Sequence, residues 1–103
     1  GTYMVTFRAP ALEVGIHQAV LCTFDAAVLP AYVAVCYGSV ENCPVAAAVQ
    51  TSSVFSGILE VSKVNTIFQL LHWAELTSVV GRGVTAAITA VPAHYAIVEF
   101  LKL

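Results

Sequence analysis

The sequence predicts an all-β protein, an antiparallel sandwich of the jelly-roll type, and three observations support this. Val, Ile and Thr supply about 30 of the 103 residues, and β-branched side chains pack better on a pleated strand than in a helix. Apolar and polar residues alternate in several short runs. Gly, Pro, Asn and Ser separate these runs, and no long helical pattern competes with them, which is typical of a sandwich.

The chain is strongly apolar for its size. Hydrophobic residues make up 59% and charged residues 10%, whereas an ordinary soluble domain has roughly half and a quarter. We expect one domain, residues 1–103, and as a monomer it would leave large apolar patches in water. Self-assembly is therefore expected. Membrane insertion is not, because the longest uncharged stretch, 42–59, contains Pro44, Gln50 and several serines.

Charge and side-chain chemistry argue against several functions. A net charge of −2 with four Lys and Arg residues lacks the basic footprint that nucleic acid requires. The six carboxylates are scattered singly, and no glycine-rich phosphate loop precedes a helix. His17, Cys22 and Asp25 resemble a nucleophile set, but on a strand His17 and Cys22 face opposite sides. We expect neither an enzyme nor a bound cofactor.

The first half of the chain predicts strands interrupted by loops. Residues 2–7 alternate as a strand, which Pro10 should end. Residues 14–24 predict a second strand, with a helix as the rival interpretation. In the strand, one face would carry Ile16, Val20 and Phe24, and the other would carry His17, Ala19 and Leu21. Breakers then divide the chain into short extended pieces: Pro30, Gly38, Asn42 and Pro44.

The second half predicts a hairpin and two later strands. Residues 57–61 and 67–76 should pair across the turn 62–65, with a helix over 61–71 as the alternative. Phe68, Leu70, His72 and Ala74 should share one face of the second hairpin strand. A turn at 81–83, a strand over 84–91 ended by Pro92, and a closing strand over 95–103 follow.

Two histidines and three cysteines have more than one interpretation. His17 and His72 fall on corresponding faces of two predicted strands and should be neighbours. A metal site or a pH switch is one interpretation; the favoured one is a pair of core residues with hydrogen-bond partners, and no metal. Cys22, Cys36 and Cys43 are too few for a disulfide framework. A Cys36–Cys43 bridge is the alternative to three buried thiols.

Exposed aromatic and charged residues supply the candidates for recognition. Tyr32 and Tyr37 fall in the loop-rich middle, Arg82 lies in the turn 81–83, and Trp73 faces away from His72. Aromatic residues and Arg dominate recognition hot spots, while ordinary packing or assembly contacts are the alternative. Glu99 lies in the apolar last strand, and we expect it to pair with Arg8, Arg82 or Lys102, because an unpaired buried charge is costly.

A series of short marks runs through nearly the whole chain. They are Gly1-Thr2-Tyr3, Ala9-Pro10-Ala11, Val14-Gly15-x-His17-Gln18-Ala19-x-Leu21, Gly38-Ser39, Thr51-x-Ser53-x-x-x-Gly57, Phe68-x-Leu70-x-His72, Gly81-x-Gly83-Val84 and Tyr95-x-x-Val98-Glu99. In order and spacing the chain resembles the terminal head domain of bacteriophage tail-fibre and collar proteins, a jelly roll similar to the tumour-necrosis-factor and C1q heads.

The resemblance implies a homotrimer on the outside of a virion, with loops over 25–53 and 77–83 that bind a host-surface glycan or protein. The last strand is apolar on both faces, so we expect it at the threefold axis, through Tyr95, Ile97, Val98, Phe100 and Leu101. The chain departs from the family in its few charges and in starting at an inner strand, so strands preceding Gly1 are an open expectation. The rival functions are a shell or decoration protein of a virus particle without receptor binding, and a small enzyme with a helical middle.

Overall fold

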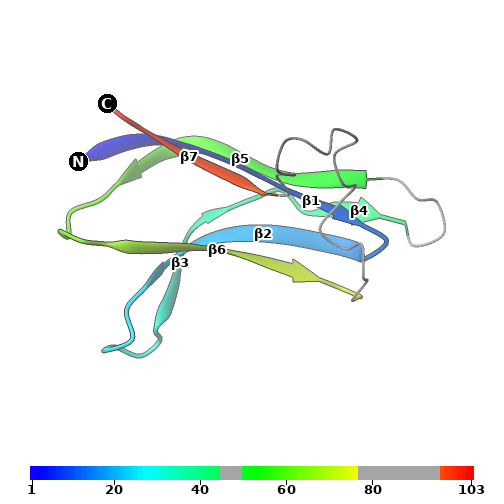
Figure 1. Ribbon diagram of the computed structural model, residues 1–103, viewed down its shortest axis with the longest axis horizontal. Helices are drawn as coiled ribbons and strands as arrows, with labels where there is room; N and C mark the ends of the chain where they lie inside the picture. Colours follow the sequence, from blue (N-terminus) through cyan, green and yellow to red (C-terminus); the bar gives the residue numbers. More distant parts are fainter. Residues whose placement is uncertain (45–49, 77–95) are drawn as a thin grey trace, which may run out of the picture.

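The computed structural model describes residues 1–44, 50–76 and 96–103, which form seven strands in two antiparallel sheets (Figure 1). In the β1 sheet, β1 (Thr2–Leu12) lies between β5 (Gln50–Glu60) and β7 (Ile97–Lys102). In the β2 sheet, β2 (Gly15–Phe24) pairs with β3 (Tyr32–Tyr37) and β4 (Glu41–Cys43) along one edge and with β6 (Ile67–Ala74) along the other. The predicted all-β sandwich is confirmed for these residues.

The core lies between the two sheets because alternate residues of each strand point inward. Its central cluster comprises Val5, Phe7, Ala9, Ala19, Leu21 and Cys36. The rings of Phe7 and Phe55 stack at 5.4 Å within the β1 sheet. A second cluster lies at the end of the sandwich where the chain turns from β1 to β2, with Ala11, Leu12, Val14 and Cys43. The β-strand over 14–24 is confirmed, and the rival helix is wrong.

Pro10 does not end the first strand, contrary to the prediction. β1 continues to Leu12, and Pro10 lies opposite Ser52 of β5. The described part of β7 pairs with β1 only as far as Arg8. Pro10 is thus located where β1 has one described neighbour, and a proline is tolerated in a strand where its missing N–H is not needed for pairing.

The predicted hairpin over 57–76 has the right strands and the wrong pairing. β5 pairs with β1 and β6 pairs with β2, so the segment 61–66 carries the chain from one sheet to the other. β5 also starts at Gln50, so residues 50–53 are strand rather than loop. A crossover of this length satisfies the same alternation and turn chemistry as a hairpin, and only the packing of the two sheets distinguishes them.

The middle of the chain contains more regular structure than expected. Tyr32 and Tyr37 are the first and last residues of β3 rather than loop residues. Leu21 pairs with Cys36 and Cys22 with Ala34, so Val35 is the extra residue of a β-bulge. Val35 and Cys36 both contact the core as a result.

Several predictions fall on residues outside the described part of the chain. They are the turn 81–83 with Arg82, the strand 84–91, and Tyr95. Among the residues that are described, none forms a helix long and apolar enough to cross a membrane.

Candidate functional site

The outer surface of the β2 sheet is an uncharged, partly aromatic β-surface. Its cross-strand rows follow from the register, and we call it the aromatic face: Tyr32, Phe24 and Ile67; Tyr37, Val20 and Leu71; Gln18 and Trp73. Tyr37 and Trp73 are 64% and 60% exposed. No outward-facing residue of β2, β3 or β6 carries a charge. Such a surface is typical of a contact site, because a free soluble domain rarely exposes so wide an apolar patch.

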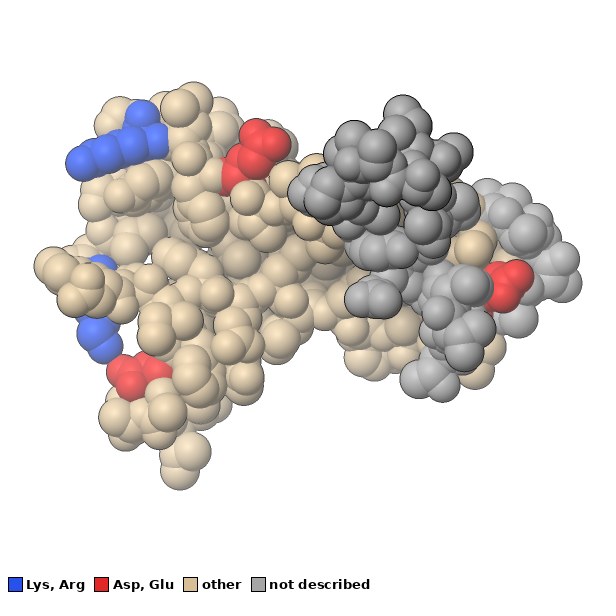
Figure 2. Space-filling model, viewed as in Figure 1, with Lys and Arg blue, Asp and Glu red and all other residues tan. Residues whose placement is uncertain are grey.

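The outer surface of the β1 sheet is also partly apolar, but charged residues interrupt it. We call it the β1 face. One row joins Met4 to Ile58 and Leu101, and another joins Arg8 to Val54 and Ile97. Ile58 and Leu101 are 55% and 65% exposed. In the view of Figure 2 only a few charged side chains interrupt the described surface.

The expected ion pair of Glu99 does not form with either of its described candidate partners. Glu99 lies opposite Thr6 on the β1 face and is exposed, so water solvates the carboxylate. Within the described ranges the ion pair is Lys63–Asp25, at 3.0 Å. Glu99 faces outward from β7 rather than into the core, so the burial on which the predicted ion pair was based is absent; the third candidate partner, Arg82, lies outside the described residues.

The residues expected at the threefold axis divide between the two sides of β7. Ile97 and Leu101 lie on the β1 face. Val98 packs against the core, and Phe100 contacts the rings of Tyr3 and Phe68 at 6.3 and 5.1 Å. Ile97 and Leu101 are therefore open to a neighbouring copy on the β1 face, and Phe100 is also accessible because it is 41% exposed, whereas Val98 is turned towards the core.

His17 and His72 are brought together as expected. His17 Nδ1 lies 2.8 Å from His72 Nε2, and His17 Nε2 lies 2.8 Å from Thr51 Oγ1. His17 is fully buried, and the chain Thr51–His17–His72 links β5 of one sheet to β2 and β6 of the other. At this separation only one of the two facing nitrogens carries hydrogen, so one ring donates and the other accepts.

Burial favours the neutral form of both imidazoles. Burial lowers the pKa of His17, while Glu41, opposite it on β4, acts in the other direction more weakly. Burial also lowers the pKa of His72, and the adjacent His17 lowers it further. The described residues contain no group of three or more His, Cys, Asp and Glu side chains that could hold a metal ion. Through its hydrogen bonds to Thr51 and to each other, the pair connects the two sheets.

A serine and a glycine complete the polar link between the sheets, and the sequence reasoning assigned them no role. Along this edge of β2, Ala19 lies in the gap between the residues that pair with β3 and those that pair with β4. Its N–H donates to Ser53 Oγ at 2.9 Å instead. Ser53 in turn donates to the Ser39 carbonyl at 2.6 Å. A Cβ on Gly38 would lie 2.8 Å from both the Ala19 carbonyl and the Phe7 ring, so glycine is required there. The marks Gly38-Ser39 and Thr51-x-Ser53 were the available signal.

Cys22, Cys36 and Cys43 are buried thiols. Cys36 belongs to the central cluster and Cys43 to the second cluster, so no Cys36–Cys43 bridge forms. Burial raises the pKa of the Cys22 and Cys36 thiols, which opposes formation of a reactive thiolate. Cys22 and His17 lie on opposite faces of β2, as expected from their spacing.

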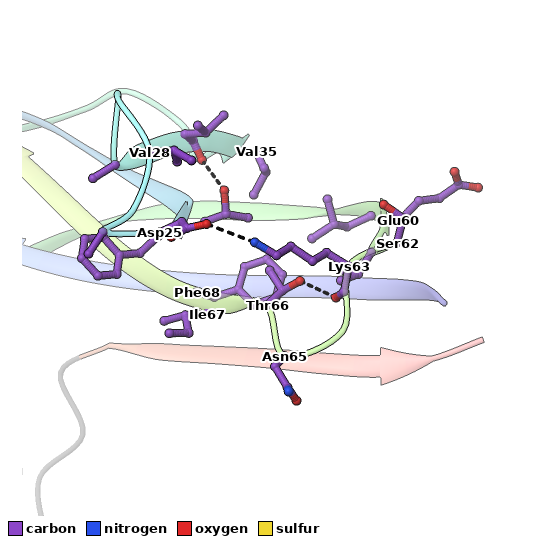
Figure 3. A pocket seen from close by; sticks show the side chains of 17 residues that line it. Asp25, Val28, Val35, Glu60, Ser62, Lys63, Asn65, Thr66, Ile67 and Phe68 are labelled. Carbon is purple, nitrogen blue, oxygen red and sulfur yellow. Dashed lines mark hydrogen bonds and ion pairs between the residues drawn. The ribbon is translucent and has the colours of Figure 1, made fainter.

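A pocket of about 470 Å³ opens between the sheets at the end where 25–31 and 61–66 lie (Figure 3). Most of its wall is apolar, with Phe24, Val28, Val33, Val35, Leu59 and Phe68. The Lys63–Asp25 ion pair crosses its mouth. The hydrogen bond from the Ala27 N–H lowers the pKa of Asp25 most, and Lys63 lowers it further. No sequence pattern indicated this pocket, because it arises where the two sheets end at different positions.

Comparison with protein-family models, with curated proteins and with solved structures gave no match to this chain.

Proposed function

We propose that this chain is a jelly-roll-like head domain of a viral fibre, which forms a homotrimer on the virion and binds a host-surface glycan or protein. One observation supports this above the others: apolar side chains are exposed on both outer faces of the sandwich. One covered face would suffice for simple association. Two faces of different composition favour assembly through one and recognition through the other.

The β1 face is the better candidate for assembly. It contains β7, and Arg8 and Glu99 lie among its apolar residues. Charges of both signs on an apolar surface favour a specific interface, because a neighbouring copy must match them. Three copies packed through this face would bury Ile58, Ile97 and Leu101.

The aromatic face is the better candidate for recognition. Tyr and Trp supply large contact area with little loss of conformational entropy, and they are enriched in binding hot spots. Gln18, opposite Trp73, and Gln69, opposite Cys22, add amide groups to this face. A neutral surface of this kind suits a partner that is itself uncharged at the contact.

The assembly is tested by the mass of the protein in solution. The wild type should measure three times the 10.9 kDa of the chain at micromolar concentration. Ile58→Lys on the β1 face should give the monomer mass, because a lysine in an interface core is strongly disfavoured. Leu71→Lys on the aromatic face is the matched control and should remain trimeric. A monomeric wild type, or a monomer produced only by Leu71→Lys, contradicts the proposal.

Recognition is tested separately with the trimeric protein on glycan arrays and on candidate host cells. Tyr37→Ala and Trp73→Ala should each weaken binding by about tenfold or more, the loss typical of hot-spot truncation. Val54→Ala on the β1 face is the control and should bind normally. Growth of the wild type into large particles without binding to glycan or cell would favour the rival proposal, a structural shell or decoration protein.

A further inference from the structure

The pocket between 25–31 and 61–66 is a place where the interior of the sandwich is left open. Val33 lies in register with Thr23 and Phe68 on the inner side of the β2 sheet, yet it is 48% exposed. β5, in the opposite sheet, ends at Glu60, so no strand of the described chain covers Val33. An inward-facing β-branched residue without a cover indicates a cavity that a ligand can fill.

The size and wall chemistry of this cavity suit a small molecule. Its volume of about 470 Å³ falls within the roughly 300–1,000 Å³ of small-ligand sites. The Phe68 ring and several aliphatic side chains form the wall, and Phe24, whose ring packs on Tyr32 at the aromatic face, borders it. The body of the ligand must therefore be apolar.

The mouth of the pocket determines the charge of the ligand. Asp25 accepts one hydrogen bond from the Ala27 N–H and another from Lys63, both at 3.0 Å. Glu60 points away from the pocket (Figure 3). The mouth thus holds one cation and one anion already paired, and a charged head group would meet a like charge beside its partner. Lys63 retains donors beyond the one given to Asp25, and they can bind a hydroxyl.

We propose that this pocket binds a neutral amphipathic molecule, an apolar chain or ring that carries a hydroxyl-bearing head group. The apolar part lies between Val33, Leu59 and Phe68. The head group lies at the Lys63–Asp25 pair. The pocket borders the aromatic face at Phe24 and Ile67, whereas Val33, Phe68 and the Lys63–Asp25 pair belong to neither outer face, and the test uses these residues.

The test compares three probes with the same octyl chain, each below its micelle concentration at pH 7: octyl glucoside, octanoate and octylammonium. Calorimetric titration of the wild-type protein should give the neutral probe the highest affinity, by about fivefold or more. Equal affinity for all three would overturn the proposal, because it would indicate adsorption to exposed apolar surface.

Two valines of equal exposure supply the matched variants. Val33→Trp fills the pocket and should lower the affinity for octyl glucoside by about tenfold. Val54→Trp, at a residue on the β1 face that is likewise 48% exposed, should leave it unchanged. Loss in both variants, or in neither, contradicts the assignment; circular dichroism checks that both are folded.

A third variant tests the mouth without touching the wall. Lys63 is 71% exposed in its side chain, so Lys63→Gln should fold normally. It leaves Asp25 without its cation, and the ratio of octylammonium to octanoate affinity should rise about fivefold or more. An unchanged ratio would show that the head group does not lie at this ion pair. The solution mass of Val33→Trp and Lys63→Gln should stay that of the wild type, which separates this result from the proposed assembly.

Discussion

At the scale of single residues, the buried histidine pair determines how the protein responds to acid. His17 is buried between Thr51 and His72, and the three side chains form one hydrogen-bonded chain across the sandwich. Adding one proton still leaves a usable arrangement, because one ring then donates to the other. A second proton places two N–H groups and two positive charges against each other. The native state therefore resists protonation of this pair.

We predict that the free energy of unfolding falls as the pH drops below about 6.5, the ordinary pKa of histidine. Both histidines have a lowered pKa in the folded state, so the unfolded chain binds more protons in this range and acid favours unfolding. The slope should reach about 1.4 kcal/mol per pH unit for each excluded proton. Above pH 7.5 the stability should no longer change from this cause.

His72→Gln tests this assignment, since glutamine can still hydrogen-bond to His17 Nδ1 but does not titrate. Urea unfolding at several pH values between 5 and 8 should show a shallower loss of stability in the variant than in the wild type. His94 is present in both proteins and cancels in the comparison. Identical slopes would show that the pair does not govern the acid response.

At the scale of the elements, the segment 61–66 shows what local sequence can and cannot predict. The turn and both flanking strands were predicted, because alternation and turn residues are local signals. The partner of each strand was not, because a crossover between sheets and a hairpin within one sheet use the same local chemistry. The same limit explains Pro10, whose tolerance depends on which strands pair with β1 at that residue.

The candidate sites divide in the same way. Alternation placed His17 and His72 on matching faces, and the register of β2 with β6 brings them together. It could not show that Thr51 and Ser53 would reach β2 from the other sheet. The pocket was equally hidden, because its volume depends on where β5 ends relative to β3. Local patterns thus predict which way a side chain points, whereas contacts between the sheets follow from packing.

The crossover itself depends on Asn65, which has a φ of 59°. Asn visits this left-handed region more readily than other residues with a side chain, and glycine does so without steric cost. We predict that Asn65→Gly changes the unfolding free energy little, while Asn65→Ala lowers it by about 1 kcal/mol. Chemical denaturation measures both. Equal losses in the two variants would mean that the amide side chain, rather than the backbone conformation, is what matters.

At the scale of the whole molecule, the two outer faces differ in composition. The aromatic face has amide groups and no charge on its three main strands, whereas the β1 face combines apolar rows with Arg8 and Glu99. A sandwich of this size gains limited stability from its own core. Covering the β1 face with further copies would add buried apolar area to each chain, so folding and assembly should be coupled.

This coupling predicts a melting temperature that rises with protein concentration. For a trimer that unfolds to separate chains, a tenfold increase in concentration adds about 0.9 kcal/mol of stability per chain. In a domain of this length that corresponds to roughly 5 °C. Scanning calorimetry of the wild type and of Leu71→Lys over two decades of concentration should show this rise. Ile58→Lys should melt at a temperature that does not depend on concentration and lies below that of the wild type. A wild-type melting temperature that is independent of concentration would mean that the β1 face adds nothing to the stability of the fold, and the apolar rows on it would need another partner.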